Sequence, residues 1–182
     1  MVDNNRNVNW VVGVRNLFGF EKVWYHQGGV NKALFIRTCK QWLCEQYIQQ
    51  WLGALRDRAG CRLYREIKTA FVYSEYLNAV RCYKWRTAFT RFRTRNHSLS
   101  NVKMGQGHLR VPYNERLCVD CGVLGDEYHC VFECRKTEHL RHILPVYYYM
   151  RRPSMAKFIE LLTTTRASEL NKLAKFLYMA DL

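Results

Sequence analysis

Apolar residues recur in steps of three and four along much of this chain, which is the spacing of an amphipathic α-helix. The longest such stretch runs from Asn31, a residue type that favours the start of a helix, to about Arg58, and Gly60 follows it. We expect this long helix to form the spine of the core. Its apolar positions are Phe35, Cys39, Trp42, Leu43, Ile48, Trp51, Leu52 and Leu55.

Two flanking regions also have short helical patterns. A helix is predicted to begin after Asn9 and to stop at Gly19, and residues 61–79 contain two further short helices. The positions expected to be buried in the second region are Leu63, Tyr64, Ile67, Phe71, Tyr76 and Leu77.

The C-terminal part of the chain is predicted to be helical as well. Residues 136–150 have helical spacing, which Pro145 should kink because proline removes a backbone donor. Ser154 and Ser168 are each predicted to cap a helix. These two helices span residues 155–162 and 169–180.

Four soft metal ligands lie within the short segment CVDCGVLGDEYHCVFEC. Cys118 and Cys121 form a CxxC pair, and His129 and Cys134 follow with four residues between them. Zinc takes four tetrahedral ligands, and a CxxC turn lets two thiolates approach one ion. We therefore predict a CCHC site for Zn²⁺. Three cysteines and one histidine leave no open coordination position, so the metal should be structural.

Other interpretations of this segment compete with a zinc site. The cysteines and the histidine can simply pack in or near a core, as we expect for Cys130, which directly follows a predicted ligand. A redox CxxC lacks the strand and helix arrangement of thioredoxin around it. His139 or His142 can replace His129 if that ring faces away. The acidic pair Asp126–Glu127 is expected to cap the element that bears His129.

The chain carries a net charge of +14, concentrated just before the cysteines. Residues 81–117 hold a net charge of +8 and residues 118–134 hold −4. No acidic residue lies between positions 81 and 114. Cations without carboxylate partners favour a polyanion such as nucleic acid. The alternative is a solvated basic face that binds nothing in particular.

A helix over residues 81–97 would place an apolar seam between these cations, since Trp85, Ala88, Phe89 and Phe92 share one face. Replacing three of the cations with glutamate is then expected to abolish nucleic-acid binding and to leave the fold intact; the three are Arg91, Arg93 and Arg95. The full set of candidate nucleic-acid-binding residues is Arg81, Lys84, Arg86, Arg91, Arg93, Arg95 and Arg116.

These features together predict a mainly α protein, a helical bundle with a small CCHC zinc-knuckle insertion. The predicted segments are a flexible leader (1–8), a helical domain (9–115) with its basic helix (81–97), the zinc module (116–135) and C-terminal helices that pack on the helical domain (136–182). The start MVDNNRNVNW has no hydrophobic signal core, and no apolar run is long enough to cross a bilayer. We expect reduced thiols, no membrane partner, and a location in the nucleus or cytoplasm rather than secretion.

The runs TRFRTRNHSL, VPYNERLCVDCG and GDEYHCVFEC followed by HLR resemble the region downstream of the polymerase in non-LTR (LINE-type) retrotransposon proteins. In that family a zinc-binding module of CxxC…HxxxxC form follows the reverse transcriptase. Arg93, His97 and Leu99 match the end of the family's basic helix, and Arg116 matches the arginine before its knuckle. This chain departs from the family pattern at Val102–Lys103, where the family commonly has an acidic residue. Its spacing of seven residues inside the knuckle also exceeds the four of the retroviral nucleocapsid knuckle.

The resemblance implies a module that grips RNA, DNA or their hybrid through the backbone, largely without sequence preference, with a reverse transcriptase core in cis. No polymerase or nuclease motif is present, so we expect no enzymatic activity from this chain. The alternative is a helical protein–protein interaction module with a structural zinc site and exposed tyrosines at 147–149. A third interpretation is an enzyme in which His97 or His108 pairs with Cys130.

Overall fold

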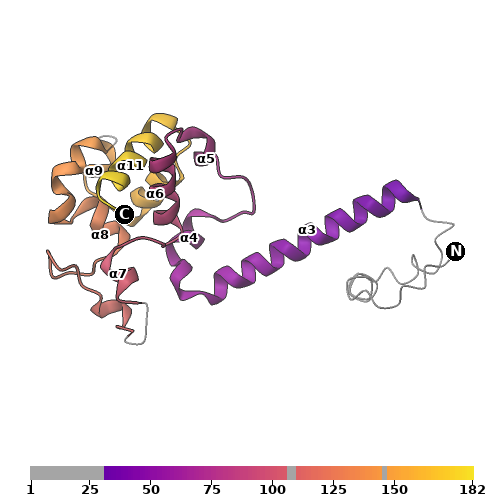
Figure 1. The fold of residues 1–182 in the computed structure, drawn as a ribbon, viewed down its shortest axis with the longest axis horizontal. Coiled ribbons are helices and arrows are strands. Elements are labelled where there is room, and N and C mark those ends of the chain that lie inside the picture. Colours follow the sequence, from indigo (N-terminus) through magenta and orange to yellow (C-terminus); the bar gives the residue numbers. More distant parts are fainter. Residues whose placement is uncertain (1–30, 106–109, 145–146) are drawn as a thin grey trace. The chain divides into compact units, whose positions relative to one another are not determined.

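The computed structural model describes residues 31–105, 110–144 and 147–182, and these residues are mainly helical (Figure 1). The prediction of a mainly α protein is confirmed. The predicted leader and the predicted helix from Asn9 to Gly19 lie outside the described residues. The chain divides into two compact units, residues 1–57 and residues 58–182. This division cuts through the predicted helical domain and unites its second part with the cysteine segment and the C-terminal helices.

The first described helix, α3 (Lys32–Asp57), begins where Asn31 predicts it. The Asn31 Oδ1 accepts a hydrogen bond from the Leu34 N–H at 3.1 Å, which satisfies one of the free donors of the first turn. No residue of α3 is buried, so the expectation that this helix is the spine of the core is wrong. Its apolar residues surround the helix instead of forming one stripe: Leu34 and Leu43, nine residues apart and therefore on opposite sides, are both exposed.

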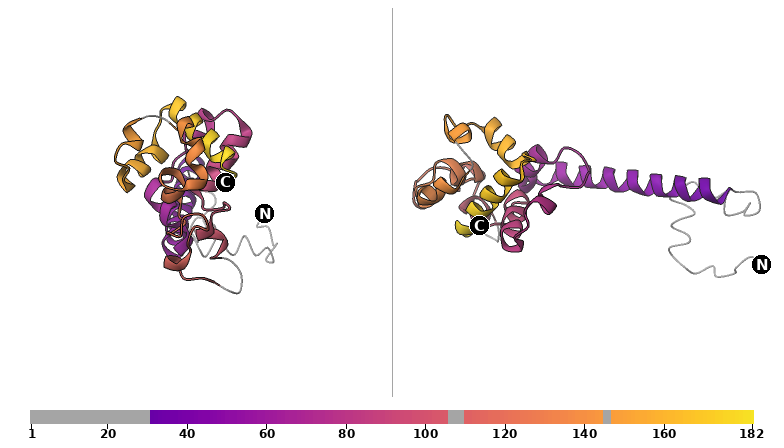
Figure 2. Two further views of the ribbon diagram at one scale, coloured as in Figure 1. Left: turned by 90° about the vertical axis from the view of Figure 1, so that its left-hand side faces the viewer. Right: turned by 90° about the horizontal axis from the view of Figure 1, so that it is seen from above.

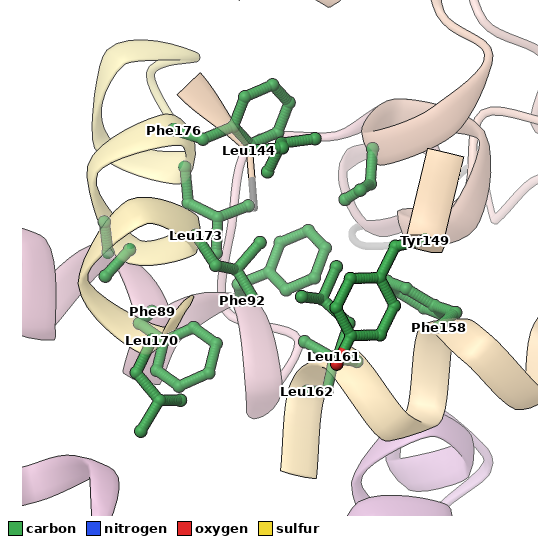
Figure 3. Packing of buried hydrophobic residues seen from close by; sticks show 14 of the residues in the cluster. Phe89, Phe92, Leu144, Tyr149, Phe158, Leu161, Leu162, Leu170, Leu173 and Phe176 are labelled. Atoms are coloured by element: carbon green, nitrogen blue, oxygen red, sulfur yellow. The ribbon is translucent and has the colours of Figure 1, made fainter. Parts of the chain in front are cut away.

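The core of residues 58–182 is built around α6 (Tyr83–Arg93) and α11 (Ala167–Met179), which lie side by side (Figure 1, Figure 2). The seam predicted on the basic helix is confirmed, because Ala88, Phe89 and Phe92 are buried and Trp85 packs at the edge of the core. Burial of each large apolar side chain stabilises the fold by roughly 1.5–3 kcal/mol. The most buried large side chains, most of which are labelled in Figure 3, are Phe89, Phe92, Phe158, Leu161, Leu162, Leu170, Leu173, Phe176 and Leu177.

Phe158 joins three helices through edge-on aromatic contacts. It lies in α10 (Met155–Thr163), and its ring centroid is 6.3 Å from that of Phe92 in α6. On its other side it lies 5.9 Å from Tyr128 and 5.9 Å from Phe132, both in α8 (Glu127–Phe132). Edge-to-face aromatic pairs stabilise beyond the area they bury. The helix that carries the candidate ligand His129 is therefore packed directly against the core.

One of the two predicted serine caps is present. The Ser154 Oγ accepts a hydrogen bond from the Lys157 N–H at 3.3 Å at the start of α10. Ser168 does not cap the last helix, because α11 begins one residue earlier and encloses it. Glu169 supplies the negative charge in the first turn instead, and its carboxylate accepts hydrogen bonds from Thr164 Oγ1 at 3.0 Å and Arg166 Nη1 at 2.9 Å.

Short helices connect these elements. They are η2 (Ala59–Cys61), α4 (Arg62–Ile67), α5 (Tyr76–Ala79), α7 (Ser100–Lys103), η3 (Tyr113–Glu115), η4 (Arg135–Ile143) and α9 (Tyr147–Met150). Ile67 is buried as predicted, whereas Phe71 is 44% exposed and the prediction for it is wrong. The segment predicted as helical from residue 136 is a 3₁₀-helix that buries Leu140. Within the described residues, no helix has the length and apolarity that a membrane crossing requires.

Candidate functional site

A tight turn presents the first two candidate ligands, Cys118 and Cys121. Leu117 and Leu124 pair as a single antiparallel bridge, and inside it the Cys118 N–H donates to the Val123 carbonyl at 2.7 Å. Gly122 closes the turn at φ +70°, a conformation that side chains rarely adopt. This backbone brings the two cysteines, which have two residues between them, to one side of the turn.

Helix α8 and the residue after it supply the other two candidate ligands, His129 and Cys134. The Asp126 Oδ1 accepts a hydrogen bond from the His129 N–H at 2.8 Å, which confirms the predicted cap. At the other end of the helix the Cys134 N–H donates to the His129 carbonyl at 2.8 Å. This bond places the cysteine one turn beyond the histidine, so both side chains reach the same point.

The four predicted ligands converge into one cluster, and their ligand atoms all lie within 4.8 Å of one another. The Cys134 Sγ is 3.7 Å from that of Cys118 and 4.0 Å from that of Cys121. Two sulfurs bound to one tetrahedral zinc at about 2.3 Å lie about 3.8 Å apart. A disulfide needs a separation of about 2.05 Å, so these sulfurs are free thiols.

The His129 ring is oriented as a metal ligand would be. Its Nδ1 lies 3.4 Å from the Glu133 Oε2, one helical turn away. Its Nε2 is buried and has no hydrogen-bond partner among the described residues. A buried nitrogen without a partner costs roughly 1–3 kcal/mol, and a metal ion removes that cost. A carboxylate behind a ligand histidine also fixes the ring and raises its basicity. The donor set therefore fits a metal ion.

Burial raises the thiol pKa of two cysteines in or beside the cluster. Cys130 is buried beside the cluster without belonging to it, and burial raises the pKa of its thiol to about 12. Burial also raises the pKa of Cys134 to about 11, with the Cys118 thiol adding to the effect. The Arg135 N–H donates to the Cys121 Sγ at 3.4 Å. His139 and His142 are exposed and lie outside the cluster.

A second polar network, which the sequence did not predict, joins α8 to the segment after α6. The Glu127 carboxylate is buried and lies 3.0 Å from the His97 Nε2 and 2.8 Å from the Asn101 Nδ2. The Leu99 N–H donates to the His97 Nδ1, so the other ring nitrogen carries the proton and donates to Glu127. Burial alone would raise the pKa of Glu127, but the His97 hydrogen bond and the nearby Arg95 outweigh it and lower that pKa.

The seven predicted nucleic-acid-binding cations occupy different environments. Arg81, Lys84 and Arg91 are exposed, and among the described residues no carboxylate pairs with them. Arg86 is half-buried, and its Nη1 donates to two backbone carbonyls, that of Leu77 at 3.2 Å and that of Val80 at 3.3 Å.

Three further candidates are held inside the fold, where the sequence predicted exposed cations. Arg93 is only 6% exposed, donates to the Leu162 carbonyl and does not line an exposed flank of its helix, which corrects the prediction. Burial lowers its pKa. Arg95 pairs with Glu127 at 3.6 Å, and Arg116 donates to the Asn101 carbonyl at 2.8 Å. These partners lie at least 15 residues away in the sequence, so a search for acidic residues close to each arginine in the sequence does not find them.

The fold and the site together define a mainly helical protein with a Cys₃His cluster that can hold a metal ion. Comparisons with known proteins add no family to this description: no family model matches the chain, and no curated protein or solved structure is significantly similar to it.

Proposed function

We propose that this protein is a zinc-stabilised nucleic-acid-binding module, derived from or belonging to a non-LTR retrotransposon protein. The observation that carries the proposal is the convergence of three thiols and a His129 ring nitrogen within 4.8 Å, in the same compact unit as the exposed cations Arg81, Lys84 and Arg91. Among the described residues the buried His129 Nε2 also has no hydrogen-bond partner. Zinc is the metal that Cys₃His sites of this spacing favour. RNA or DNA is the partner, and a reverse transcriptase core is the neighbour in cis that the sequence resemblance suggests.

The metal acts on structure rather than on the nucleic acid. Three thiolates on one Zn²⁺ leave a net charge of −1, and the surrounding segment 118–134 adds −4, so the knuckle repels phosphates. A closed set of four protein ligands also leaves no position for a reacting water. Small zinc modules bind their metal with roughly 10–16 kcal/mol of apparent free energy, which is enough to decide local folding.

The buried hydrogen bonds of Glu127 connect the candidate metal site to the segment that contains Arg95. Helix α8 holds both His129, a ligand, and Glu127, two residues earlier. Because Glu127 binds His97 and Asn101 and pairs with Arg95, a metal that fixes α8 also fixes the segment that follows the basic helix. The grip on phosphates falls to the exposed cations Arg81, Lys84 and Arg91, which contact backbones and therefore read little sequence.

Two measurements test this function. Purified, reduced protein should contain one zinc per chain by elemental analysis; protein that folds without any metal would contradict the zinc assignment. Affinity for RNA and DNA should fall with salt, at about −0.7 to −0.9 in log–log slope per phosphate contact.

A triple variant tests which cations contact the phosphates. Exchanging Arg81, Lys84 and Arg91 for glutamine should weaken binding and reduce the salt slope by about two to three. A matched control exchanges three exposed cations elsewhere for glutamine, namely Lys136, Arg152 and Lys172. Equal losses in both variants would show that net charge alone governs binding and that α6 is not the interface.

A protein–protein interaction module is the second candidate function. Tyr147 is 72% exposed, Tyr148 51% and Met155 54%, and aromatic and methionine side chains of this kind are enriched at interfaces. Tyr149 is buried and does not belong to this surface. A pull-down with and without nuclease separates the two functions, because a partner that is lost on nuclease treatment was bridged by nucleic acid.

A further inference from the structure

A cavity of about 590 Å³ within residues 58–182 has a wall rich in arginine. Its described lining comes from residues 58–62, from the two residues that follow α6, and from residues within 101–105 and 110–116. None of the four candidate metal ligands lines it, and no aspartate or glutamate in the described part of the chain does. Its five arginines are Arg58, Arg62, Arg95, Arg110 and Arg116.

Backbone carbonyls hold two of these arginines in place, and Arg95 also pairs with Glu127. Arg95 Nη2 and Arg116 Nη1 both donate to the Asn101 carbonyl, at 3.1 and 2.8 Å, and the Arg116 Nε donates to the Val111 carbonyl at 2.8 Å. Carbonyl partners orient a guanidinium without neutralising it. Each guanidinium has five N–H donors, so both retain donors for a further acceptor in the cavity.

Three of the cations lie over the Tyr113 ring. The guanidinium carbons of Arg62, Arg95 and Arg116 lie 5.5, 5.5 and 5.8 Å from its centroid. Each contact is favourable by itself, but cations around one ring repel one another. Within the described part of the chain, Arg95 is the one arginine of the five that pairs with an acid. The other four arginines have no acidic ion-pair partner among the described residues, and a group of such cations is the electrostatic character of an anion site.

Gly105 makes room for one of these side chains. A Cβ at this position would overlap the Arg116 Nη1 and lie 2.7 Å from its guanidinium carbon. Any other residue here would displace the guanidinium from its present place. The missing side chain at position 105 thus leaves space for the Arg116 guanidinium in the cavity wall.

We propose that this five-arginine cavity binds a phosphate group of a nucleic-acid strand and forms the centre of the interface, and that the exposed cations Arg81, Lys84 and Arg91 contact the strand outside the cavity. The inference rests on the proposed nucleic-acid function and deepens it. Guanidinium groups bind phosphate through paired charge-assisted hydrogen bonds. The cavity volume lies in the range of pockets that hold small organic ligands, so a nucleotide unit can enter together with its phosphate.

The test measures binding of fluorescent single-stranded RNA and DNA oligonucleotides to the full chain by anisotropy. One variant, Arg62→Gln with Arg110→Gln, removes two cavity cations whose guanidinium groups make no hydrogen bond within the described residues. A second variant, Gly105→Ala, displaces Arg116 without any change in net charge. The control exchanges Lys136 and Lys172 for glutamine and so matches the double variant in charge. Zinc content and thermal unfolding of each variant establish that it is folded.

The double variant should lose about tenfold or more in affinity, because charge-assisted hydrogen bonds are the strong class, and Gly105→Ala should lose affinity at unchanged charge. The control should change affinity by less than about twofold. Inorganic phosphate should compete with the strand on the wild type and less on the double variant. Wild-type affinity in both cavity variants would overturn the proposal.

The outcomes separate this cavity from the proposed function. If the strand binds and only the Arg81, Lys84 and Arg91 variant weakens it, the cavity is not the interface and the nucleic-acid function stands. If no strand binds, but a nucleoside monophosphate or a phosphatidylserine vesicle does so through Arg62 and Arg110, the proposed function and the assignment to nucleic acid are both wrong.

Discussion

Replacement of Arg93 by methionine should destabilise the protein, although the sequence suggested that changes at this position leave the fold intact. Arg93 donates to the Leu162 carbonyl, one of the last carbonyls of α10, which have no partner inside their own helix. Its guanidinium also lies 4.8 Å from the centroid of the Tyr76 ring and 5.5 Å from that of Phe89. A cation therefore caps the C-terminus of α10 from the neighbouring helix α6.

The magnitude follows from these contacts. Methionine keeps most of the apolar stem but leaves the carbonyl without its charged donor, which costs about 1.5–3 kcal/mol. Loss of the cation at the helix terminus adds roughly 0.3–1 kcal/mol. Removal of a buried charge returns part of this cost, because the guanidinium no longer has to be desolvated. We expect a net loss of about 2–3 kcal/mol, a large part of the roughly 5–15 kcal/mol that stabilises a typical domain.

Chemical denaturation followed by tryptophan fluorescence measures this loss, and Arg91→Met is the matched control on the same helix. Arg91 is exposed, so its replacement should change the free energy of unfolding by no more than about 0.5 kcal/mol. If both variants unfold within about 0.5 kcal/mol of each other, the buried guanidinium contributes nothing to α10 and the reasoning is refuted.

Three further predictions concern the metal cluster, the buried network and the last helix. Cys121→Ser should lower zinc content by elemental analysis, whereas Cys130→Ala should retain the metal because that thiol lies outside the cluster. Glu127→Gln should lower the free energy of unfolding by about 1–3 kcal/mol, because it removes the negative charge that faces Arg95 and a carboxylate oxygen that accepts a buried hydrogen bond. Denaturation curves that match the wild type would contradict this. Glu169, whose pKa is lowered because its hydrogen bonds outweigh the effect of burial, should contribute stability above its ordinary pKa of about 4.3, and this contribution should disappear as pH falls through the folded-state pKa. Thermal unfolding of the wild type and of Glu169→Gln between pH 3 and pH 7 checks this, and parallel pH profiles would refute it.

The sequence predicted the Cys₃His cluster well because the four residues lie close together in the chain. Four donors within one short segment are brought together by a single turn and one helix, and both have sequence signals. Gly122 and Asp126 supply these signals, the first at positive φ and the second as a helix cap. The seam of α6 was predictable for the same reason, since helical periodicity acts over a few residues.

Burial of whole elements was less predictable, because it depends on partners far away in the sequence. The long pattern in α3 contains enough apolar residues for a core helix, yet they surround the helix, and none is buried. Arg93 shows the opposite error. Its charge suggested exposure, whereas a carbonyl 69 residues away and two aromatic rings accommodate it inside the fold. Periodicity carries no information about such partners.

The acidic knuckle and the basic surface are parts of one arrangement. Three of the four acids in residues 118–134 serve internal roles: Asp126 caps α8, Glu133 lies behind the His129 ring, and Glu127 holds His97 and Asn101. Each acts within the polypeptide that a metal ion would fix, and Glu127 is the acid that pairs with a cavity arginine. These acids thus orient a candidate ligand and one cation, and the other four cavity arginines have no acidic partner among the described residues. This division of charge is the arrangement that the nucleic-acid partner we propose requires.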